Sequence, residues 1–362
     1  MKKKAISLFS GAGGFDLGFE AEGFDIVFAN EMNSDACSTW IRNRENKKNV
    51  MNKGDICDLG NNLKLDYEID LVFGGPPCQG FSVAGKMQQD DKRNELVFSF
   101  MDMVSKVKPK AFVMENVGAL ATHAKWGEIR KALTDRASQL GYATSLNVFL
   151  MSNYGVPQNR KRMLFIGFLD GEKCVNNFIS YIEQEKSQPK KLREVLTSVG
   201  EYGSPSNPET CFAKITIAKN PVIRGSAYSG MLMNGSGRPL DLDSHAPTIT
   251  ASMGGNRTPI VDQRALENPT NQNWCVSLYE GIVDPLKTPP KTVPGHVRRL
   301  TVKEAAAIQT FPADYVFVGS KCSQYRQIGN AVPPVFAQAV ARSMIRCLND
   351  KEGVSHEPED IL

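Results

Sequence analysis

Several features that would place the chain in a specialised class are missing from its 362 residues. The eight cysteines form no C-x-x-C pair, so we expect neither a metal site nor a disulfide framework, and a reducing compartment fits. No apolar run is long enough to cross a membrane. The net charge is only +4, so any nucleic-acid surface must be a local basic face. The composition, 41% hydrophobic and 23% charged, is that of a folded protein with a sizeable core.

Predicted strands and helices alternate through the first half of the chain. Short apolar, β-favouring runs occupy residues 4–9, 24–29, 69–73, 111–114, 142–150 and 163–167, and amphipathic stretches separate most of them. This alternation is typical of an α/β fold with a doubly wound, mostly parallel sheet. The length allows one large domain and a smaller one.

Cys78 stands at the predicted carboxyl end of a strand. Two glycines and the pair Pro76-Pro77 separate it from the apolar run and prevent an immediate helix. Open α/β sheets place their chemistry at this end of their strands. A structural cysteine would more naturally lie inside the apolar run, so the position favours a reactive thiol.

A glycine-rich turn follows the first predicted strand. Glycines at 11, 13 and 14 would let a ligand approach the backbone closely, as a nucleotide-type cofactor does. The spacing is not G-x-G-x-x-G, which weakens the case for a nicotinamide-dependent oxidoreductase. Glu31 follows the second strand, at a distance where an acid commonly accepts hydrogen bonds from a ribose.

Charged residues also follow two later strands. Glu115 comes at the end of the strand over 111–114, where a carboxylate is a candidate general acid or base. Gln158, Arg160 and Arg162 alternate at the strand period, so we expect both arginines on one side, suited to gripping a nucleotide and its phosphate.

The composition changes from about residue 171. Glycine, proline, serine, asparagine and threonine become frequent, and periodicity fades after a short helix at 192–198. Two glycine-rich segments, 229–238 and 251–257, carry side chains suited to base edges, although each could equally be an ordinary surface loop. Thr301 and Glu304 then form a predicted capping box at the start of a helix.

Taken together and in order, these motifs resemble the DNA (cytosine-5) methyltransferase family. The resemblance rests on Phe-x-Gly-x-Gly-Gly at 9–14, Pro-Pro-Cys at 76–78, Glu-Asn-Val at 115–117, Gln-x-Arg-x-Arg at 158–162 and Gly-Asn-Ala-Val at 329–332. It covers residues 4 to about 348. It implies the S-adenosylmethionine-dependent methyltransferase fold, with S-adenosyl-L-methionine as the cofactor.

The resemblance also implies a division of the chain. Residues 1–170 would form the first part of the catalytic and cofactor-binding domain, and 171–297 a smaller loop-rich target-recognition domain. Residues 298–349 would return to the catalytic domain, and 350–362 would form a tail.

The resemblance assigns roles to single residues. The catalytic group would be Cys78 as the nucleophile on carbon 6, Glu115 on the N3 edge, Arg162 on the edge of the flipped base and Arg160 orienting Glu115 or the phosphate. The cofactor group would be Phe9, Gly11, Ala12, Gly14, Glu31, Asp55, Ile56, Pro77, Leu96, Asn330 and Val332. DNA would be contacted by Gln79, Ser82, Gln158, Arg238, Thr248, Asn256 and Arg257.

The implied activity is methylation of carbon 5 of a flipped cytosine in a specific double-stranded DNA sequence. We expect a monomer in the bacterial cytoplasm, associated with the nucleoid, that protects DNA against a partner restriction endonuclease and has no membrane partner. Two alternatives stay open beside it. One is a tRNA cytosine-5 methyltransferase of the same fold, and the other is a catalytically silent DNA-binding protein.

Overall fold

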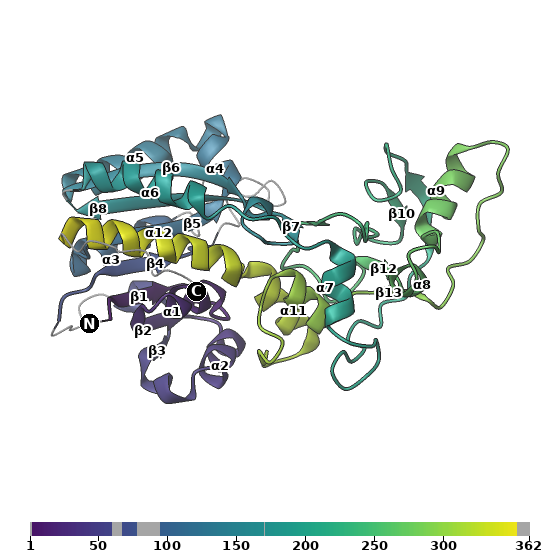
Figure 1. Cartoon of the computed structure of the whole chain (residues 1–362), viewed down its shortest axis with the longest axis horizontal. Helices are drawn as coiled ribbons and strands as arrows, with labels where there is room; N and C mark the ends of the chain where they lie inside the picture. Colours follow the sequence, from purple (N-terminus) through teal and green to yellow (C-terminus); the bar gives the residue numbers. More distant parts are fainter. Residues whose placement is uncertain (1, 60–66, 78–94, 170, 353–362) are drawn as a thin grey trace, which may run out of the picture. The chain divides into compact units, whose positions relative to one another are not determined.

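The computed structural model describes residues 2–59, 67–77, 95–169 and 171–352, and contacts within the chain divide it into two units (Figure 1). Unit 1 comprises Met1–Tyr154, Lys161–Ser187 and Val332–Leu362. Unit 2 comprises Gly155–Arg160 and Gln188–Ala331. Within the described ranges, no helix is both long enough and apolar enough to span a membrane.

A seven-stranded sheet, counted over the described residues, forms the centre of unit 1 in the order β3-β2-β1-β4-β5-β8-β6. Its strands are β1 (Lys4–Leu8), β2 (Asp25–Glu31), β3 (Met51–Lys53), β4 (Leu71–Gly74), β5 (Ala111–Val117), β6 (Tyr142–Leu150) and β8 (Lys161–Leu169). Only β8 runs antiparallel to its neighbours. The chain order reverses between β1 and β4, which makes their carboxyl ends the place where such a sheet binds ligands.

The helices of unit 1 pack on the sheet and on one another. They are α1 (Gly14–Ala21), α2 (Ser34–Arg42), α3 (Leu96–Val107), α4 (Gly118–Thr122), α5 (Gly127–Gln139), α6 (Glu172–Gln184) and α12 (Pro334–Glu352), with short 3₁₀ turns η1 (Glu45–Val50), η2 (Ile56–Leu59), η4 (Ala124–Trp126) and η5 (Met151–Asn153).

Successive residues of the central strands face opposite layers of helices. Phe73 in β4 stacks on Phe19 of α1, with ring centroids 4.3 Å apart. Phe112 in β5 belongs instead to a core cluster with Phe100 of α3. Because both faces of the sheet are covered, its strands read as continuous apolar runs. The predicted doubly wound α/β architecture is confirmed.

The last helix closes unit 1 from the far end of the sequence. In Figure 1 the yellow α12 lies with α6 and with α1, and the contacts between these helices agree. A β-carbon at Gly18 would stand 2.4 Å from the β-carbon of Ala337, so only glycine permits this close packing of α1 on α12.

Unit 2 is made of short elements joined by long loops. Its strands are β7 (Gln158–Asn159), β9 (Ile217–Val222), β10 (Met231–Met233), β11 (Ala246–Pro247), β12 (Ile260–Asp262) and β13 (Val297–Arg299). Its helices are α7 (Leu192–Ser198), α8 (Gln263–Glu267), α9 (Trp274–Val283), α10 (Val302–Ile308) and α11 (Lys321–Asn330). Its strands pair two by two, as β9 with β10, β11 with β7, and β12 with β13.

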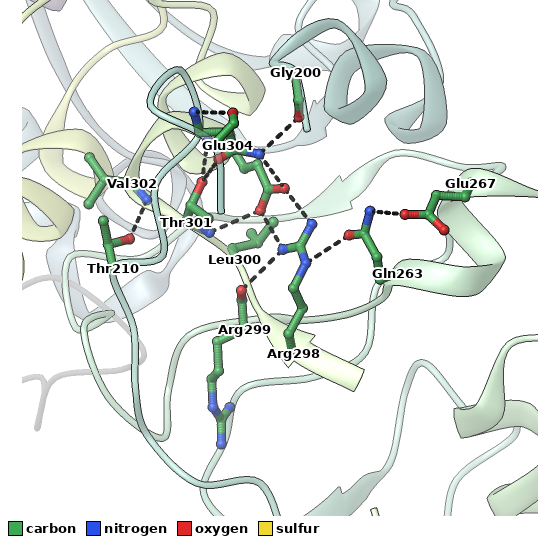
Figure 2. Close-up of polar contacts among 12 residues, drawn as sticks. Gly200, Thr210, Gln263, Glu267, Arg298, Arg299, Leu300, Thr301, Val302 and Glu304 are labelled. Atoms are coloured by element: carbon green, nitrogen blue, oxygen red, sulfur yellow. Dashed lines mark hydrogen bonds and ion pairs between the residues drawn. The ribbon is translucent and has the colours of Figure 1, made fainter. Parts of the chain in front are cut away.

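A buried polar network compensates for the scarcity of regular structure in unit 2 (Figure 2). Arg298 donates to both oxygens of Glu304, at 2.8 and 2.6 Å, and both side chains are almost fully buried. Glu304 completes the predicted capping box with Thr301. Gln263 accepts from Arg298, and Thr210 accepts from the backbone of Val302. Residues far apart in the sequence, such as Thr210 and Gln263, are thereby held at the start of α10.

The contact units differ from the predicted domain ranges at both junctions. Helix α6, expected in the recognition block, packs on α12 and on β6 and β8 of unit 1. Residues 298–331, expected in the returning catalytic segment, belong to unit 2 because the network of Arg298 and Glu304 lies there. That unit 2 reads the DNA sequence stays a prediction.

Candidate active site

The glycine-rich turn after β1 forms the predicted ligand-facing loop. Phe9 has φ 52, Gly11 φ 56 and Gly13 φ 82, so three of five successive residues are left-handed. Glycine adopts this conformation freely, whereas Phe9 is strained in it. A β-carbon at Gly11 would meet no atom nearer than the oxygen of Phe9, 4.0 Å away. The backbone at Gly11 is therefore open to a ligand.

Two acids predicted for the cofactor lie at the neighbouring strand ends. Glu31 accepts hydrogen bonds from the backbone N–H of Gly11 at 2.9 Å and of Asn33 at 2.7 Å. Asn30 donates to the carbonyl of Gly54 at 3.0 Å, which ties the end of β2 to the segment carrying Asp55. The carboxyl ends of β1, β2 and β3 thus bring together the glycine turn, Glu31 and the start of η2, where Ile56 is buried.

A buried cluster that the sequence did not suggest lies behind the glycine turn. Asp16 is fully buried in the first turn of α1 and accepts from the indole N–H of Trp40 at 2.7 Å. Arg44 donates to the carbonyl of Gly13 at 3.2 Å and to Glu20 at 2.7 Å. Burial raises the pKa of Asp16 from 3.8 to about 6, although the nearby Arg44 charge opposes the shift. In the sequence, the burial of Asp16 is indicated only by its two apolar neighbours, Phe15 and Leu17.

Glu115 lies on β5, next to the end of β4. A β-carbon at Gly75 would be 3.0 Å from one Glu115 carboxylate oxygen, so the backbone of Gly75 and this side chain are in contact range. Asn116 donates to the carbonyl of Pro76 at 3.2 Å and anchors the Pro76-Pro77 segment. Cys78, Gln79 and Ser82 lie outside the described residues. The Glu115 side chain thus lies against Gly75, which precedes the predicted nucleophile Cys78 by three residues in the sequence.

Arg162 holds the Glu115 carboxylate in place. Its Nε lies 2.9 Å from Oε1 of Glu115, and the two side chains are only 15% and 10% exposed. Strand pairing explains the contact, because β8 runs antiparallel to β5 with Arg162 opposite Val117, two residues from Glu115. The carboxylate therefore has one fixed cationic partner.

Arg160 bonds to main-chain oxygens within unit 2, and its predicted role in orienting Glu115 or the phosphate stays a prediction. It is 2% exposed and donates to the carbonyls of Ile249 at 3.1 Å and Gly329 at 3.2 Å. The expected alternation fails because β7 ends at Asn159 and β8 begins at Lys161, so Arg160 lies in neither strand.

Gln158 is also an internal tether, where we predicted a DNA contact. It is fully buried, its amide donates to Gln309, and its carbonyl oxygen accepts from the backbone of Ile249 at 2.8 Å. Gln309 in turn donates to the carbonyls of Ile328 and Ala331. The Gln-x-Arg pair therefore holds the loop at Ile249 and the last turn of α11 within unit 2.

The remaining predicted residues are distributed over both units. Asn256 and Arg257 are exposed, and Arg238 and Thr248 are half-buried. Asn330 is exposed at the end of α11 in unit 2, whereas Val332 is buried in unit 1. The other predicted cofactor residues in unit 1 are Ala12, which is buried, Gly14, which starts α1, and Leu96, which starts α3 and packs against the core.

Comparison with known proteins identifies the family. The sequence model of the C-5 cytosine-specific DNA methylases matches residues 3–346. The chain belongs to this family. It is 34% identical over 357 residues to the type II methyltransferase M1.HphI of Haemophilus parahaemolyticus, an alignment covering 94% of this chain and 86% of that one. It is 31% identical to M.NgoPII of Neisseria gonorrhoeae, covering 95% and 96%.

Solved structures agree on the fold of this methylase. The S. pombe Dnmt2 methyltransferase superposes with a TM-score of 0.64 at 16% identity, covering 97% of this chain and 99% of that one. The Entamoeba histolytica methyltransferase EhMeth gives 0.63 at 17%, with the same coverage. The family match favours a DNA cytosine-5 methyltransferase over the two alternatives that the sequence left open.

The open glycine turn fits the family cofactor, S-adenosyl-L-methionine. The backbone of Gly11 has a free face, and Glu31 keeps unused lone pairs on both carboxylate oxygens for hydroxyl donors. Bound there, the cofactor supplies an electrophilic methyl group on a sulfonium. In the described part of the chain, no group of histidine, cysteine or acidic side chains has the arrangement of a metal site.

Proposed function

We propose that this DNA methylase is the modification enzyme of a type II restriction–modification pair, acting on a flipped cytosine within one specific duplex sequence. The names of relatives such as M1.HphI, aligned over most of both chains, support this assignment. We expect the enzyme to act as a monomer in the bacterial cytoplasm, without physical contact with the endonuclease.

The observation that carries the proposed chemistry is the Glu115 carboxylate, pressed against Gly75 and held by Arg162. Carbon 5 of cytosine is a poor nucleophile, so the ring must first gain electron density. Cys78 thiolate adds to carbon 6, while Glu115 hydrogen-bonds the N3 edge and favours protonation there. Carbon 5 then becomes nucleophilic enough to accept the methyl group, and loss of its proton expels the cysteine.

The proposed role of Arg162 follows from its contact. By holding Oε1 it fixes the rotamer of Glu115 and leaves Oε2 free to meet the base. The flipped base would enter at the carboxyl ends of β4 and β5, between the Pro76-Pro77 segment and Glu115.

A covalent trap tests the proposed nucleophile. Duplex DNA with 5-fluorocytosine at the target cannot lose fluorine as a proton, so a denaturant-resistant complex should accumulate when cofactor is present. The complex should be absent with Cys78→Ser, which should still bind DNA. Normal methylation by that variant would contradict the assignment.

Expression in a bacterial host tests the biological role. Bisulfite sequencing of a resident plasmid should show 5-methylcytosine at one recurrent sequence, and that plasmid should resist an endonuclease that cuts there. Glu115→Gln provides the matched inactive control. Methylation scattered without a common sequence would contradict a modification enzyme but leave the methylase chemistry standing.

A further inference from the structure

We propose that Arg44 is a positioning residue for the cofactor. Its guanidinium, bonded to the carbonyl of Gly13, keeps the glycine-rich turn after β1 in the conformation that receives S-adenosyl-L-methionine. The inference rests on the proposed cofactor site at Gly11 and deepens it. Arg44 lies outside the sequence motifs on which the family resemblance depends.

The turn is open at one glycine and filled at another. A β-carbon at Gly11 would meet no atom nearer than 4.0 Å. A β-carbon at Gly13 would lie 2.7 Å from a guanidinium nitrogen of Arg44 and 2.9 Å from a ring carbon of Trp40. A ligand can therefore approach the backbone at Gly11, whereas Arg44 and Trp40 occupy the space at Gly13.

Arg44 is itself held in place by its backbone and its side chain. Its N–H donates to the carbonyl of Ile41 at 3.0 Å, and its own carbonyl accepts from Lys47 at 2.9 Å. Its Nε lies 2.7 Å from the Glu20 carboxylate, and the side chain is 5% exposed. Its guanidinium carbon is 4.7 Å from the centre of the Trp40 ring. A charged donor that is fixed and shielded from water forms a strong hydrogen bond.

The Gly13 carbonyl joins the turn to helix α1. It accepts from the N–H of Leu17 at 3.0 Å, which closes the first turn of the helix, and from Arg44 at 3.2 Å. Gly13 is the N-cap residue of α1 and has no side chain with which to cap it. Because glycine adopts many backbone conformations, a second bond at this carbonyl restricts the turn to one of them.

Stability alone does not account for a buried arginine here. Helix α1 is already held by the close contact of Gly18 with Ala337 and by the stacking of Phe19 on Phe73. Burying charged groups is costly, and apolar residues of similar volume often fill such positions equally well. An apolar side chain, however, has no donor for the Gly13 carbonyl.

A turn that already has its binding conformation binds the cofactor more tightly. When only a fraction of the molecules is competent, the apparent dissociation constant rises by the inverse of that fraction. Because saturating cofactor restores the conformation, loss of Arg44 should raise the KM for the cofactor and change kcat far less. The cofactor and its product, S-adenosylhomocysteine, should be affected alike, since the same backbone receives both.

Calorimetric titration of the full-length protein without DNA tests the inference. Arg44→Met keeps a side chain of similar length against Trp40 but removes the donors. It should weaken binding of both S-adenosyl-L-methionine and S-adenosylhomocysteine roughly tenfold, the loss expected of one hydrogen bond to a charged group. Arg42→Met is the matched control, because the Arg42 side chain is 60% exposed and pairs with Glu45 at the surface.

Two further measurements separate positioning from folding. Hydrogen exchange of the cofactor-free protein should become faster at the amides of Gly13 and Leu17 in Arg44→Met but not in Arg42→Met. If Arg44→Met does not fold, the double variant Asp16→Asn/Arg44→Met, which removes the buried carboxylate charge together with the cation, replaces it. Its reference is Asp16→Asn alone, and the same tenfold loss is expected.

Equal cofactor affinities of Arg44→Met and Arg42→Met would overturn the inference. So would a loss confined to the cationic S-adenosyl-L-methionine, because Arg44 would then act through its charge and not through the turn. Gly11→Asn tests the site itself, since asparagine tolerates the left-handed conformation and its side chain would fill the open space. Normal affinity of Gly11→Asn would overturn the cofactor site, and failure of the wild-type protein to methylate any DNA would overturn the proposed function.

Discussion

Asp16 makes the stability of unit 1 depend on pH in a direction that can be calculated. Burial raises its pKa from 3.8 to about 6, so the folded protein binds this proton more tightly than the unfolded chain. At a pH above both values, ionised Asp16 lowers the free energy of unfolding by about 3 kcal/mol, since one pKa unit is worth about 1.4 kcal/mol. The protonated Asp16 side chain carries no such penalty. The wild-type protein therefore keeps this stability below about pH 4 and loses it as the pH rises to about 6.

Asp16→Asn removes the ionisation and keeps an oxygen that can accept from Trp40. Arg44 keeps its bond to Glu20, so no buried cation loses its partner. The variant should therefore gain stability relative to wild type as pH rises from about 4 to about 6, levelling at a gain of about 3 kcal/mol above pH 7.

Urea unfolding at several values between pH 4 and pH 8 measures this difference. A Trp274→Phe background leaves Trp40 and Trp126, which report on unit 1 alone, so separate unfolding of unit 2 does not blur the transition. Asp135→Asn on the exposed face of α5 is the control and should show a far smaller pH-dependent difference. A flat difference for Asp16→Asn, or one that shrinks with rising pH, would refute the reasoning.

Three further predictions concern the two units. Arg162→Ala should lower kcat with little change in melting temperature, whereas Arg160→Ala should destabilise unit 2. Kinetic and thermal assays of both variants measure this, and the reverse pattern would reject the role of Arg160 as a tether. Glu304→Gln should lower the free energy of unfolding, measured in urea, by about 3–5 kcal/mol because it leaves Arg298 buried without its counter-charge. Its control, Glu280→Gln in an exposed ion pair, should leave stability unchanged. Asp55→Ala should weaken cofactor binding in calorimetry with the fold intact, and unchanged affinity would remove Asp55 from the site.

Local patterns predicted the fold well because they do not depend on distant residues. The strand at 142–150 and the helix at 192–198 have the bounds that their sequence predicts. The capping box of Thr301 and Glu304 is present because both partners lie within one turn. These elements depend on propensity and spacing, which the chain displays directly.

The site was predicted less completely, since its side chains find partners far away in sequence. Strand alternation placed Arg160 and Arg162 on one side, but a break at residue 160 sends the first to Ile249 and Gly329. Asp16 escaped notice because its burial depends on Trp40 and Arg44, which no spacing rule connects to it.

The tether of Arg160 has a consequence for how this protein can diversify. The acceptors of Arg160 at Ile249 and Gly329 are main-chain oxygens, and the carbonyl oxygen of Gln158 likewise accepts from a main-chain N–H. A main-chain atom is the same whichever amino acid carries it, so side chains of the loop near residue 249 can mutate without loosening the joint. Selection could then exchange the exposed residues around that loop one at a time, and each intermediate would still fold. A fixed pair of residues at 158 and 160 thereby keeps the frame of unit 2 unchanged while the exposed residues around it vary.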